Sequence, residues 1–233
     1  MKKSFIWGAA IFLIILVVAL LLIKAAWQKT PEKANTDLGT AARAESFKPT
    51  NSPTISAEEK LIGSINAPIK VLVYEDYSNT FSADVAASIK KLETEYGDKI
   101  VVAVRPYAVR EKPVSIQAAM AVECALEQGK WQEMRNTIFN AVAANNLNTD
   151  AINNAAINIG LDQTKLGACL TDAEKQGIML QVAEDAKKFS VYGAPTIFVN
   201  NELIVGARPY EDYTDETGAQ IEGLKNLVGR QIK

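Results

Sequence analysis

The chain has 233 residues, a length that allows one domain with appendages, and 48% of its residues are hydrophobic. It contains no histidine and only two cysteines, 45 positions apart. This excludes Ser-His-Asp and Cys-His catalysis, a four-cysteine zinc site and a C-x-x-C redox pair. Residues 1–54 carry seven Lys/Arg against three Asp/Glu, whereas the remainder is net acidic. An acidic body repels phosphate backbones, so we expect no nucleic-acid partner.

The N-terminal segment Phe5–Ile23 is apolar at 18 of its 19 positions and carries no charge. As a helix it would span about 28 Å, close to the hydrocarbon thickness of a bilayer. Trp7 lies near its start and Trp27 follows its end, as interfacial aromatic residues do. The rival interpretation is a cleaved signal peptide, which has a shorter apolar region ending in small residues. We expect residues 1–27 to form an uncleaved transmembrane anchor, followed by a polar, flexible linker over 28–54.

The body, residues 55–233, opens with the pattern of a β-α-β unit. Ile69–Tyr74 is a short apolar, β-branched run that predicts a buried strand, and Ile100–Val104 predicts a second one. Between them, Ser78-Asn79-Thr80 are residues of the helix-capping type, and apolar positions recur at helical spacing up to Gly97. The sequence therefore predicts two parallel strands joined by a crossover helix.

The second half of the body predicts a large helical insertion and then a hairpin. Helical patterns fill the stretch from about 113 to 190, which is far longer than a simple crossover needs. Two apolar runs then flank the Asn200-Asn201-Glu202 turn, a hairpin signal, and a helix over Ile221–Ile232 closes the domain. The predicted fold class is α/β, in the order β-α-β, helical insertion, β-β-α.

Three motifs of the body resemble the DsbA-like branch of the thioredoxin superfamily. The stretch Ala67–Tyr77 is similar to the first strand and the aromatic approach to the active site. Ala118–Trp131 is similar to the inserted helices, and Gly193-Ala194-Pro195-Thr196 to the cis-proline loop. The three occur in the family's order over most of residues 58–210. The resemblance implies a thioredoxin fold behind the membrane anchor, in a family of thiol–disulfide oxidoreductases.

The family's active-site motif is missing its cysteines in this chain. The positions that resemble the C-x-x-C read Asn79-Thr80-Phe81-Ser82. Asparagine forms no mixed disulfide, and the chain has no histidine to activate Ser82. We expect Asn79 to be a helix N-cap and Ser82 a polar residue of the first turn, with no catalytic residue at this site.

The proline loop predicts a different role. In the thioredoxin fold, the residue before the cis-proline can offer backbone hydrogen bonds to an extended peptide, and here that residue is Ala194. A peptide groove at Ala194, Pro195 and Thr196 can therefore be retained although the thiol chemistry is lost. The alternative is that Pro195 only shapes the turn into the following strand.

Cys124 and Cys169 both fall in the helical insertion, where the resemblance implies a structural disulfide. Such a bridge fits an oxidising compartment and favours a cytoplasmic N-terminus with the body outside a cell membrane, an orientation that the flanking lysines do not decide. Two buried free thiols, or an unusual redox-active pair, are the alternatives.

Four acidic residues near the C-terminus supply oxygen atoms of the kind that calcium binds, but they lack the spacing of an EF-hand. We interpret them as a solvated acidic turn and expect no metal ion and no cofactor. They are Glu211, Asp212, Asp215 and Glu216.

These observations lead to three hypotheses. The first is a redox-inactive module that binds extracytoplasmic proteins or extended peptides, or acts as a chaperone; an exposed Phe81 beside the Pro195 loop would favour it. The second is an oxidoreductase that forms disulfides outside the cytoplasm through Cys124 and Cys169, favoured by exposed, reducible cysteines. The third is a scaffold within an envelope complex, favoured by a closed, polar groove.

Overall fold

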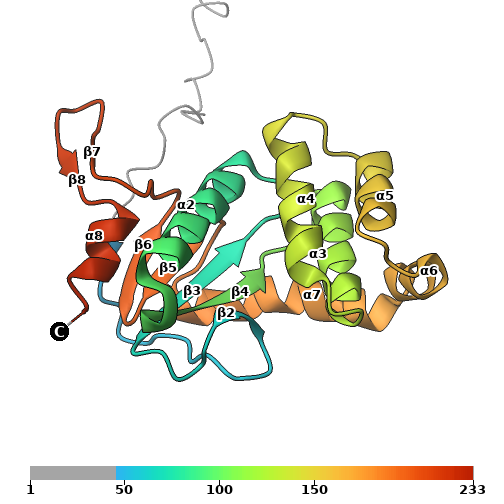
Figure 1. Cartoon of the computed structure of the whole chain (residues 1–233), viewed down its shortest axis with the longest axis horizontal. Coiled ribbons are helices and arrows are strands. Elements are labelled where there is room, and N and C mark those ends of the chain that lie inside the picture. The colour runs from blue at the N-terminus through green and yellow to red at the C-terminus, as the bar shows by residue number, and fades with distance from the viewer. Residues whose placement is uncertain (1–45, 233) are drawn as a thin grey trace, which may run out of the picture. The chain divides into compact units, whose positions relative to one another are not determined.

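The computed structural model describes residues 46–232, and a six-stranded mixed sheet lies at its centre (Figure 1). The strand order is β1-β6-β5-β3-β4-β2, and β7 with β8 forms a separate two-stranded ribbon. The strands are β1 (Ser46–Phe47), β2 (Lys60–Gly63), β3 (Ile69–Glu75), β4 (Ile100–Pro106), β5 (Thr196–Val199), β6 (Glu202–Val205), β7 (Tyr213–Thr214) and β8 (Gln220–Ile221). The α-helices are α2 (Thr80–Tyr96), α3 (Pro113–Leu126), α4 (Trp131–Ala143), α5 (Thr149–Asn158), α6 (Gln163–Leu170), α7 (Ala173–Ala186) and α8 (Leu224–Gly229).

The predicted β-α-β unit is present as β3, α2 and β4. The two strands are parallel, with Ile69 opposite Ile100 and Glu75 opposite Pro106. Strand β5 is antiparallel to β3, so the hairpin β5–β6 extends the sheet on the side away from β4. Asn200 turns this hairpin with a φ of 52°, a left-handed conformation that asparagine tolerates better than most residues. The predicted order β-α-β, helical insertion, β-β-α is confirmed.

The sheet is covered on both faces because side chains alternate along each strand. On one face, Val71 and Val73 of β3 belong to a large core together with residues of α2, α3, α4 and α8. On the other face, Leu72 and Tyr74 pack with Ala186 at the end of α7 and with Phe198 of β5. Both faces of β3 are therefore dry, which explains why its sequence is almost continuously apolar.

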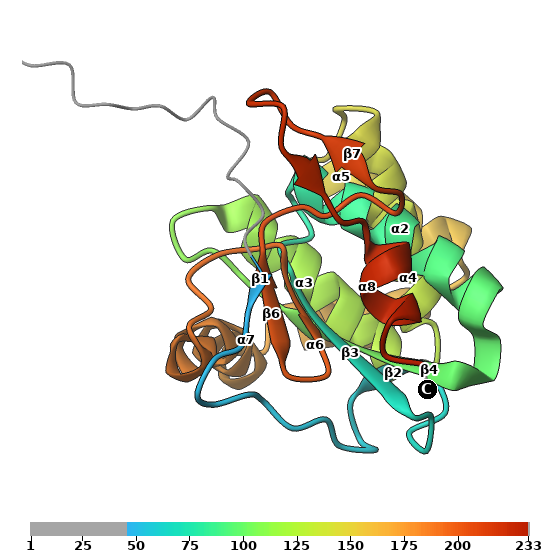
Figure 2. The ribbon, with the colours of Figure 1, turned by 90° about the vertical axis from the view of Figure 1, so that its left-hand side faces the viewer.

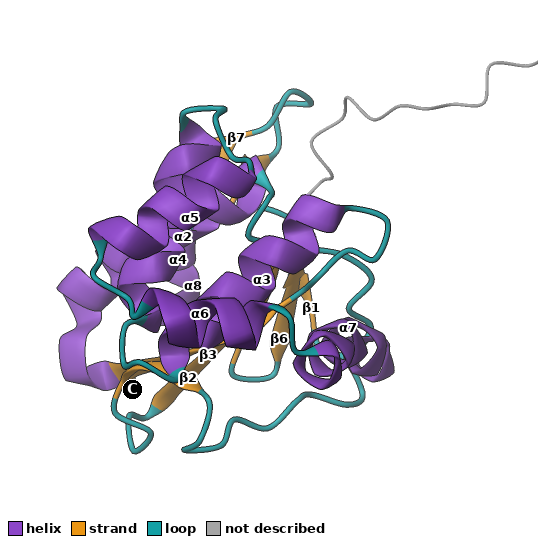
Figure 3. Ribbon diagram, turned by 90° about the vertical axis from the view of Figure 1, so that its right-hand side faces the viewer, coloured by secondary structure: helices purple, strands orange, loops and turns teal. Residues whose placement is uncertain are grey.

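The helical insertion comprises α3 to α7, in agreement with the range of about 113–190 predicted for it. Figures 1 and 3 show α3, α4, α5 and α6 gathered beside one another, and α7 runs along the sheet at an angle to them while also packing against α3. Helix α3 is the centre of this group, and buried alanines such as Ala118 and Ala125 let its neighbours approach closely.

Two edge strands extend the predicted sheet. Strand β2 pairs with β4, and β1 pairs with β6, next to which it lies in Figure 2. Strand β1 falls within the range 28–54 predicted as linker, so the folded part begins upstream of residue 55. No helix within residues 46–232 is long and apolar enough to cross a bilayer. The predicted anchor at Phe5–Ile23 lies outside the described residues.

The acidic segment before α8 forms the β7–β8 hairpin and its flanking turns. Asp215 Oδ1 accepts hydrogen bonds from the amides of Thr217 and Ala219, both at 2.9 Å. Asp212 accepts from the Gly223 amide at 2.7 Å, just before α8. These carboxylates thus organise the chain locally, and α8 is shorter than the predicted helix Ile221–Ile232.

Candidate functional site

The first turn of α2 is capped by Asn79, as the sequence predicts. Its Oδ1 accepts hydrogen bonds from the Phe81 amide at 2.8 Å and the Ser82 amide at 3.3 Å. Asn79 itself has an extended backbone, with φ −110° and ψ 128°. The side chain thus satisfies two amide groups that a helix N-terminus otherwise leaves without partners.

Ser82 is fully buried, and its hydroxyl serves the backbone. Its Oγ accepts a hydrogen bond from the Asp76 amide at 3.3 Å. A nucleophilic serine needs a neighbouring base, and the chain contains no histidine to provide one. The arrangement ties the start of α2 to the end of β3 and supplies no activated nucleophile.

Asp76 connects this turn to the helical insertion. Its Oδ1 accepts three hydrogen bonds: from the Ser78 amide at 2.9 Å, the Ser78 hydroxyl at 2.8 Å and the Ser115 hydroxyl at 2.7 Å. Ser115 Oγ in turn accepts from the Val109 amide at 3.0 Å. Asp76 is 2% exposed, so this network is part of the interior.

The proline loop lies beside this turn. The peptide bond between Ala194 and Pro195 is cis, the Pro195 carbonyl accepts from the Gly206 amide at 3.0 Å, and the Thr196 hydroxyl donates to the Gly193 carbonyl at 2.8 Å. By contrast, neither the N–H nor the C=O of Ala194 makes a hydrogen bond to any part of the chain that the structure describes. These two groups are available to an incoming backbone.

A cleft of about 480 Å³ opens in front of these groups. We call it the Ala194 cleft: it lies between Tyr192–Ala194, the loop Tyr107–Lys112 and helix α7, and it also reaches Asp76 and Asn79. Tyr192 lines the cleft and is 76% exposed; Phe81, two residues after Asn79 in the first turn of α2, is 50% exposed and does not line it. Exposed aromatic rings beside free backbone groups are typical of surfaces that bind peptides.

A buried ion pair involves the residue that precedes Asp76. Glu75, at the end of β3, is bound by Arg135 of α4 through two hydrogen bonds, Nε to Oε2 at 2.7 Å and Nη2 to Oε1 at 2.5 Å. The two side chains are 0% and 4% exposed. Burial by itself lowers the pKa of Arg135, but the charge and hydrogen bonds of Glu75 outweigh it and raise that pKa.

The neighbouring Tyr77 is equally buried and packs edge-on against Phe139, with 5.6 Å between the ring centroids. Its hydroxyl has no hydrogen-bond partner among residues 46–232. Burial, and then the nearby Glu75 carboxylate, raise the pKa of Tyr77 well above its usual value. The hydroxyl therefore stays protonated and takes no part in acid–base chemistry near neutral pH.

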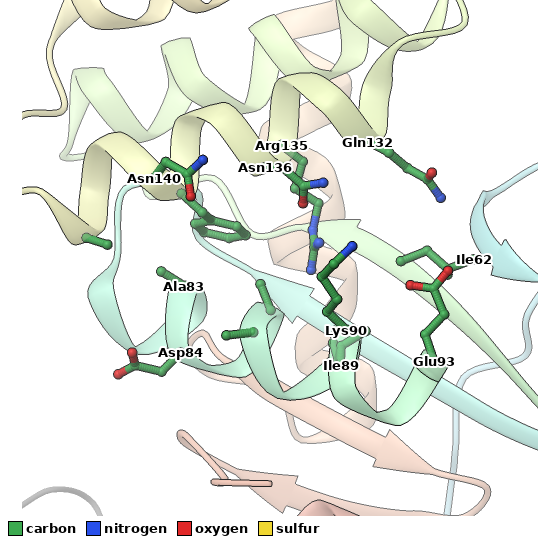
Figure 4. A pocket seen from close by; sticks show the side chains of 14 residues that line it. Ile62, Ala83, Asp84, Ile89, Lys90, Glu93, Gln132, Arg135, Asn136 and Asn140 are labelled. Atoms are coloured by element: carbon green, nitrogen blue, oxygen red, sulfur yellow. The ribbon is translucent and has the colours of Figure 1, made fainter. Parts of the chain in front are cut away.

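A second cleft, of about 490 Å³, separates α2 from α4. Figure 4 shows Lys90 and Glu93 of α2, and Arg135 and Asn136 of α4, projecting into it. Its one deeply buried charged residue, Arg135, is already bound by Glu75. This cleft is therefore lined by one side of an internal ion pair and by exposed polar side chains of α2 and α4.

Cys124 of α3 and Cys169 of α6 form a disulfide, with their Cα atoms 5.8 Å apart. The two residues are only 1% and 6% exposed. The bridge thus lies inside the helical insertion, joining two of its helices, and its sulfur atoms are shielded from large thiol reagents.

Comparison with known proteins identifies the family. A family model described as Thioredoxin matches residues 55–216. The chain belongs to the thioredoxin family. Solved structures show the fold: α-DsbA1 of Wolbachia pipientis is similar with a TM-score of 0.59 at 16% identity, over 76% of this chain and 92% of that chain. A periplasmic thioredoxin-like protein of Salmonella enterica serovar Typhimurium has a TM-score of 0.58 at 19% identity, over 74% and 89%. These likenesses show a DsbA-like thioredoxin fold.

Part of a longer curated protein also matches the chain. It is the Na(+)/H(+) antiporter NhaA 1 of Mycobacterium sp. (strain KMS), 27% identical over 154 residues. The match covers 64% of this chain and 25% of the antiporter. The chain therefore spans about a quarter of the length of the curated relatives it matches.

Of the residues predicted for the site of this thioredoxin-family chain, the structure places two in one cleft. Asn79 and Ala194 line one cleft, whereas Cys124 and Cys169 lie apart from it in the insertion. The sequence prediction missed Tyr192 and the carboxylates that end β3. The adjacent acids Glu75-Asp76 were a signal, because carboxylates directly after a buried strand must find partners inside the fold.

Proposed function

We propose that this thioredoxin-family chain binds extended segments of other proteins in the Ala194 cleft and performs no thiol–disulfide exchange. The observation that carries the proposal is the pair of free backbone groups on Ala194, next to a cis-proline and facing a cleft. An extended peptide can pair with such groups as an added strand, and nearby side chains then contribute affinity.

The first turn of α2 supports the redox-inactive part of the proposal. Thiol exchange needs a thiolate, and the aligned positions hold Asn79 and Ser82, whose side-chain oxygens each accept hydrogen bonds from backbone amides. The helix start has become a fixed structural unit. Its neighbour Phe81 is half-exposed, as a binding surface requires.

The cysteine pair supports a structural role in preference to an oxidoreductase that uses Cys124 and Cys169. A redox-active pair needs at least one accessible, activated sulfur, and both residues are buried among helices of the insertion. A disulfide also suits an oxidising environment. We therefore place the domain outside the cytoplasm. The similar Salmonella protein is described as periplasmic.

The proposal includes the division of the chain predicted from its sequence. An anchor within residues 1–27 would hold the protein in a cell membrane with its N-terminus in the cytoplasm. The linker would extend from residue 28 to the first strand of the folded part. The partners would be proteins or unfolded segments outside the cytoplasm, met at the surface of the membrane.

The aromatic residues near the cleft provide the test. We expect the double variant Phe81→Ala/Tyr192→Ala to weaken binding of an extended peptide by about tenfold or more, because exposed aromatic side chains dominate binding at such surfaces. The measurement is fluorescence anisotropy with the full chain in mild detergent and a labelled unstructured peptide. Thermal unfolding should change little, since both side chains are at least half-exposed.

A matched control removes a similar amount of exposed apolar surface elsewhere. Ile157 of α5 and Ile178 of α7 are 57% and 52% exposed, and neither lines the Ala194 cleft. The variant Ile157→Ala/Ile178→Ala should bind the peptide as the wild type does. Equal losses in both double variants would show non-specific adsorption and would count against the proposal.

A further inference from the structure

Two adjacent carboxylates at the end of β3 differ in their partners. Glu75 is neutralised by Arg135 through two hydrogen bonds. Asp76 is almost as deeply buried, yet it forms no ion pair with any residue between 46 and 232. A buried carboxylate without a cation is costly, and proteins rarely keep one without a use for it.

One carboxylate oxygen of Asp76 can still accept a hydrogen bond. Oδ1 accepts all three of its side-chain hydrogen bonds, from Ser78 and Ser115, and Oδ2 accepts none within the described residues. Asp76 also lines the Ala194 cleft. One oxygen therefore fixes the carboxylate in place while the other can accept a hydrogen bond from a bound molecule.

The lining of the cleft suits a long side chain with a charged end. Leu180 and Ala183 of α7, with the rings of Tyr107 and Tyr192, provide apolar surface for a hydrocarbon stem. Asp76 is the one buried charged residue among those that line the cleft; five exposed ones carry charges of both signs at its rim. These five are Arg110, Glu111, Lys112, Glu184 and Lys187, of which Lys187 donates to Glu184 at 2.6 Å.

We propose that Asp76 makes the Ala194 cleft selective for a lysine or arginine side chain of the bound peptide. This inference rests on the proposed function, because Ala194 would hold the peptide backbone whose side chain enters the cleft. The cation would form an ion pair with Asp76, as Arg135 does with Glu75. Asp76 thereby becomes a specificity-determining residue, at a site without thiol chemistry.

Two peptides test the preference. One is a fluorescent ten-residue peptide of serine and threonine with one tyrosine and one central lysine, and the other has norleucine in place of the lysine. With the wild-type full chain in mild detergent, the lysine peptide should bind about tenfold more tightly, the value of one buried charged hydrogen bond. Norleucine keeps the hydrocarbon stem and removes only the charge.

The variant Asp76→Asn keeps Oδ1 for Ser78 and Ser115 and replaces Oδ2 by an amide. It should bind both peptides equally, with the affinity that the wild type has for the norleucine peptide. Asp84→Asn, on an exposed residue of α2 outside this cleft, removes the same charge and should keep the lysine preference. If both peptides bind the wild type equally well, the role of Asp76 is overturned. If both also lose affinity in Phe81→Ala/Tyr192→Ala, the proposed function still stands. Absence of binding by either peptide would overturn both.

A second measurement needs no variant of Asp76. A zero-length carbodiimide joins a lysine amine only to a carboxylate that it touches, and peptide mapping by mass spectrometry then locates the bond. Coupling of the lysine peptide to Asp76 is the expected result. Coupling only to Glu111 or Glu184 at the rim would overturn the proposal.

Discussion

Replacing Arg135 by methionine is expected to lower the free energy of unfolding by about 3–5 kcal/mol. The substitution leaves the Glu75 carboxylate inside the protein, at 0% exposure, without the guanidinium that binds it at 2.5 and 2.7 Å. Methionine fills much of the space of the arginine stem, so the loss reports the unpaired charge more than a cavity. Urea unfolding followed by circular dichroism on the full chain is the measurement.

The double variant Glu75→Leu/Arg135→Met separates charge from packing. With both charges removed, most of the lost stability should return, because an apolar pair of similar volume replaces a buried ion pair at little cost. As a control, Lys187→Met breaks a surface pair whose side chains are about half-exposed and should leave stability nearly unchanged. A single variant as stable as the wild type would contradict the buried pair described above.

Removing the disulfide has the second large effect. The variant Cys124→Ala/Cys169→Ala is expected to lose about 4 kcal/mol of stability, because the bridge closes a loop of 45 residues in the unfolded chain. Alanine suits these buried positions, since it leaves no polar group without a partner. The comparison is urea unfolding of wild type and variant, and of wild type with and without a reductant.

The same pair of proteins tests the redox alternative. Denatured wild type should show no free thiol before reduction and two after it. We expect no catalysed reduction of a protein disulfide by either protein, since the bridge is buried and Asn79 and Ser82 carry no sulfur. Turnover that depends on the two cysteines would overturn the redox-inactive account and assign an oxidoreductase function to the insertion.

The elements predicted from sequence are those whose signals are local. β3 and β4 are apolar because both sides of each are buried, and the start of α2 follows from the capping side chain of Asn79. Edge strands give weaker signals. β2 has four residues and includes a lysine, Lys60, whose burial depends on an ion pair to Glu123, 63 positions away, at 2.7 Å. No local pattern contains that partner.

The same difference between local and distant signals applies to the residues of the candidate site. Asn79, Ala194 and Pro195 could be found because short motifs carry them. The contacts that hold the two carboxylates, Glu75 with Arg135 and Asp76 with Ser115, join residues 60 and 39 positions apart. Only the docking of the helical insertion against the end of β3 creates these contacts. The carboxylates were visible in the sequence, whereas their different partners were not.

Hydrogen–deuterium exchange at Ala194 is the most direct test of the account. Its amide has no hydrogen bond within residues 46–232, so it should exchange quickly in the free full chain. On saturation with the lysine-containing peptide, we expect slower exchange in the segment 190–194 and around Asn79–Ser82, and no change in α5. Unchanged exchange at Ala194 with bound peptide, or protection confined to another surface, would contradict binding at this loop.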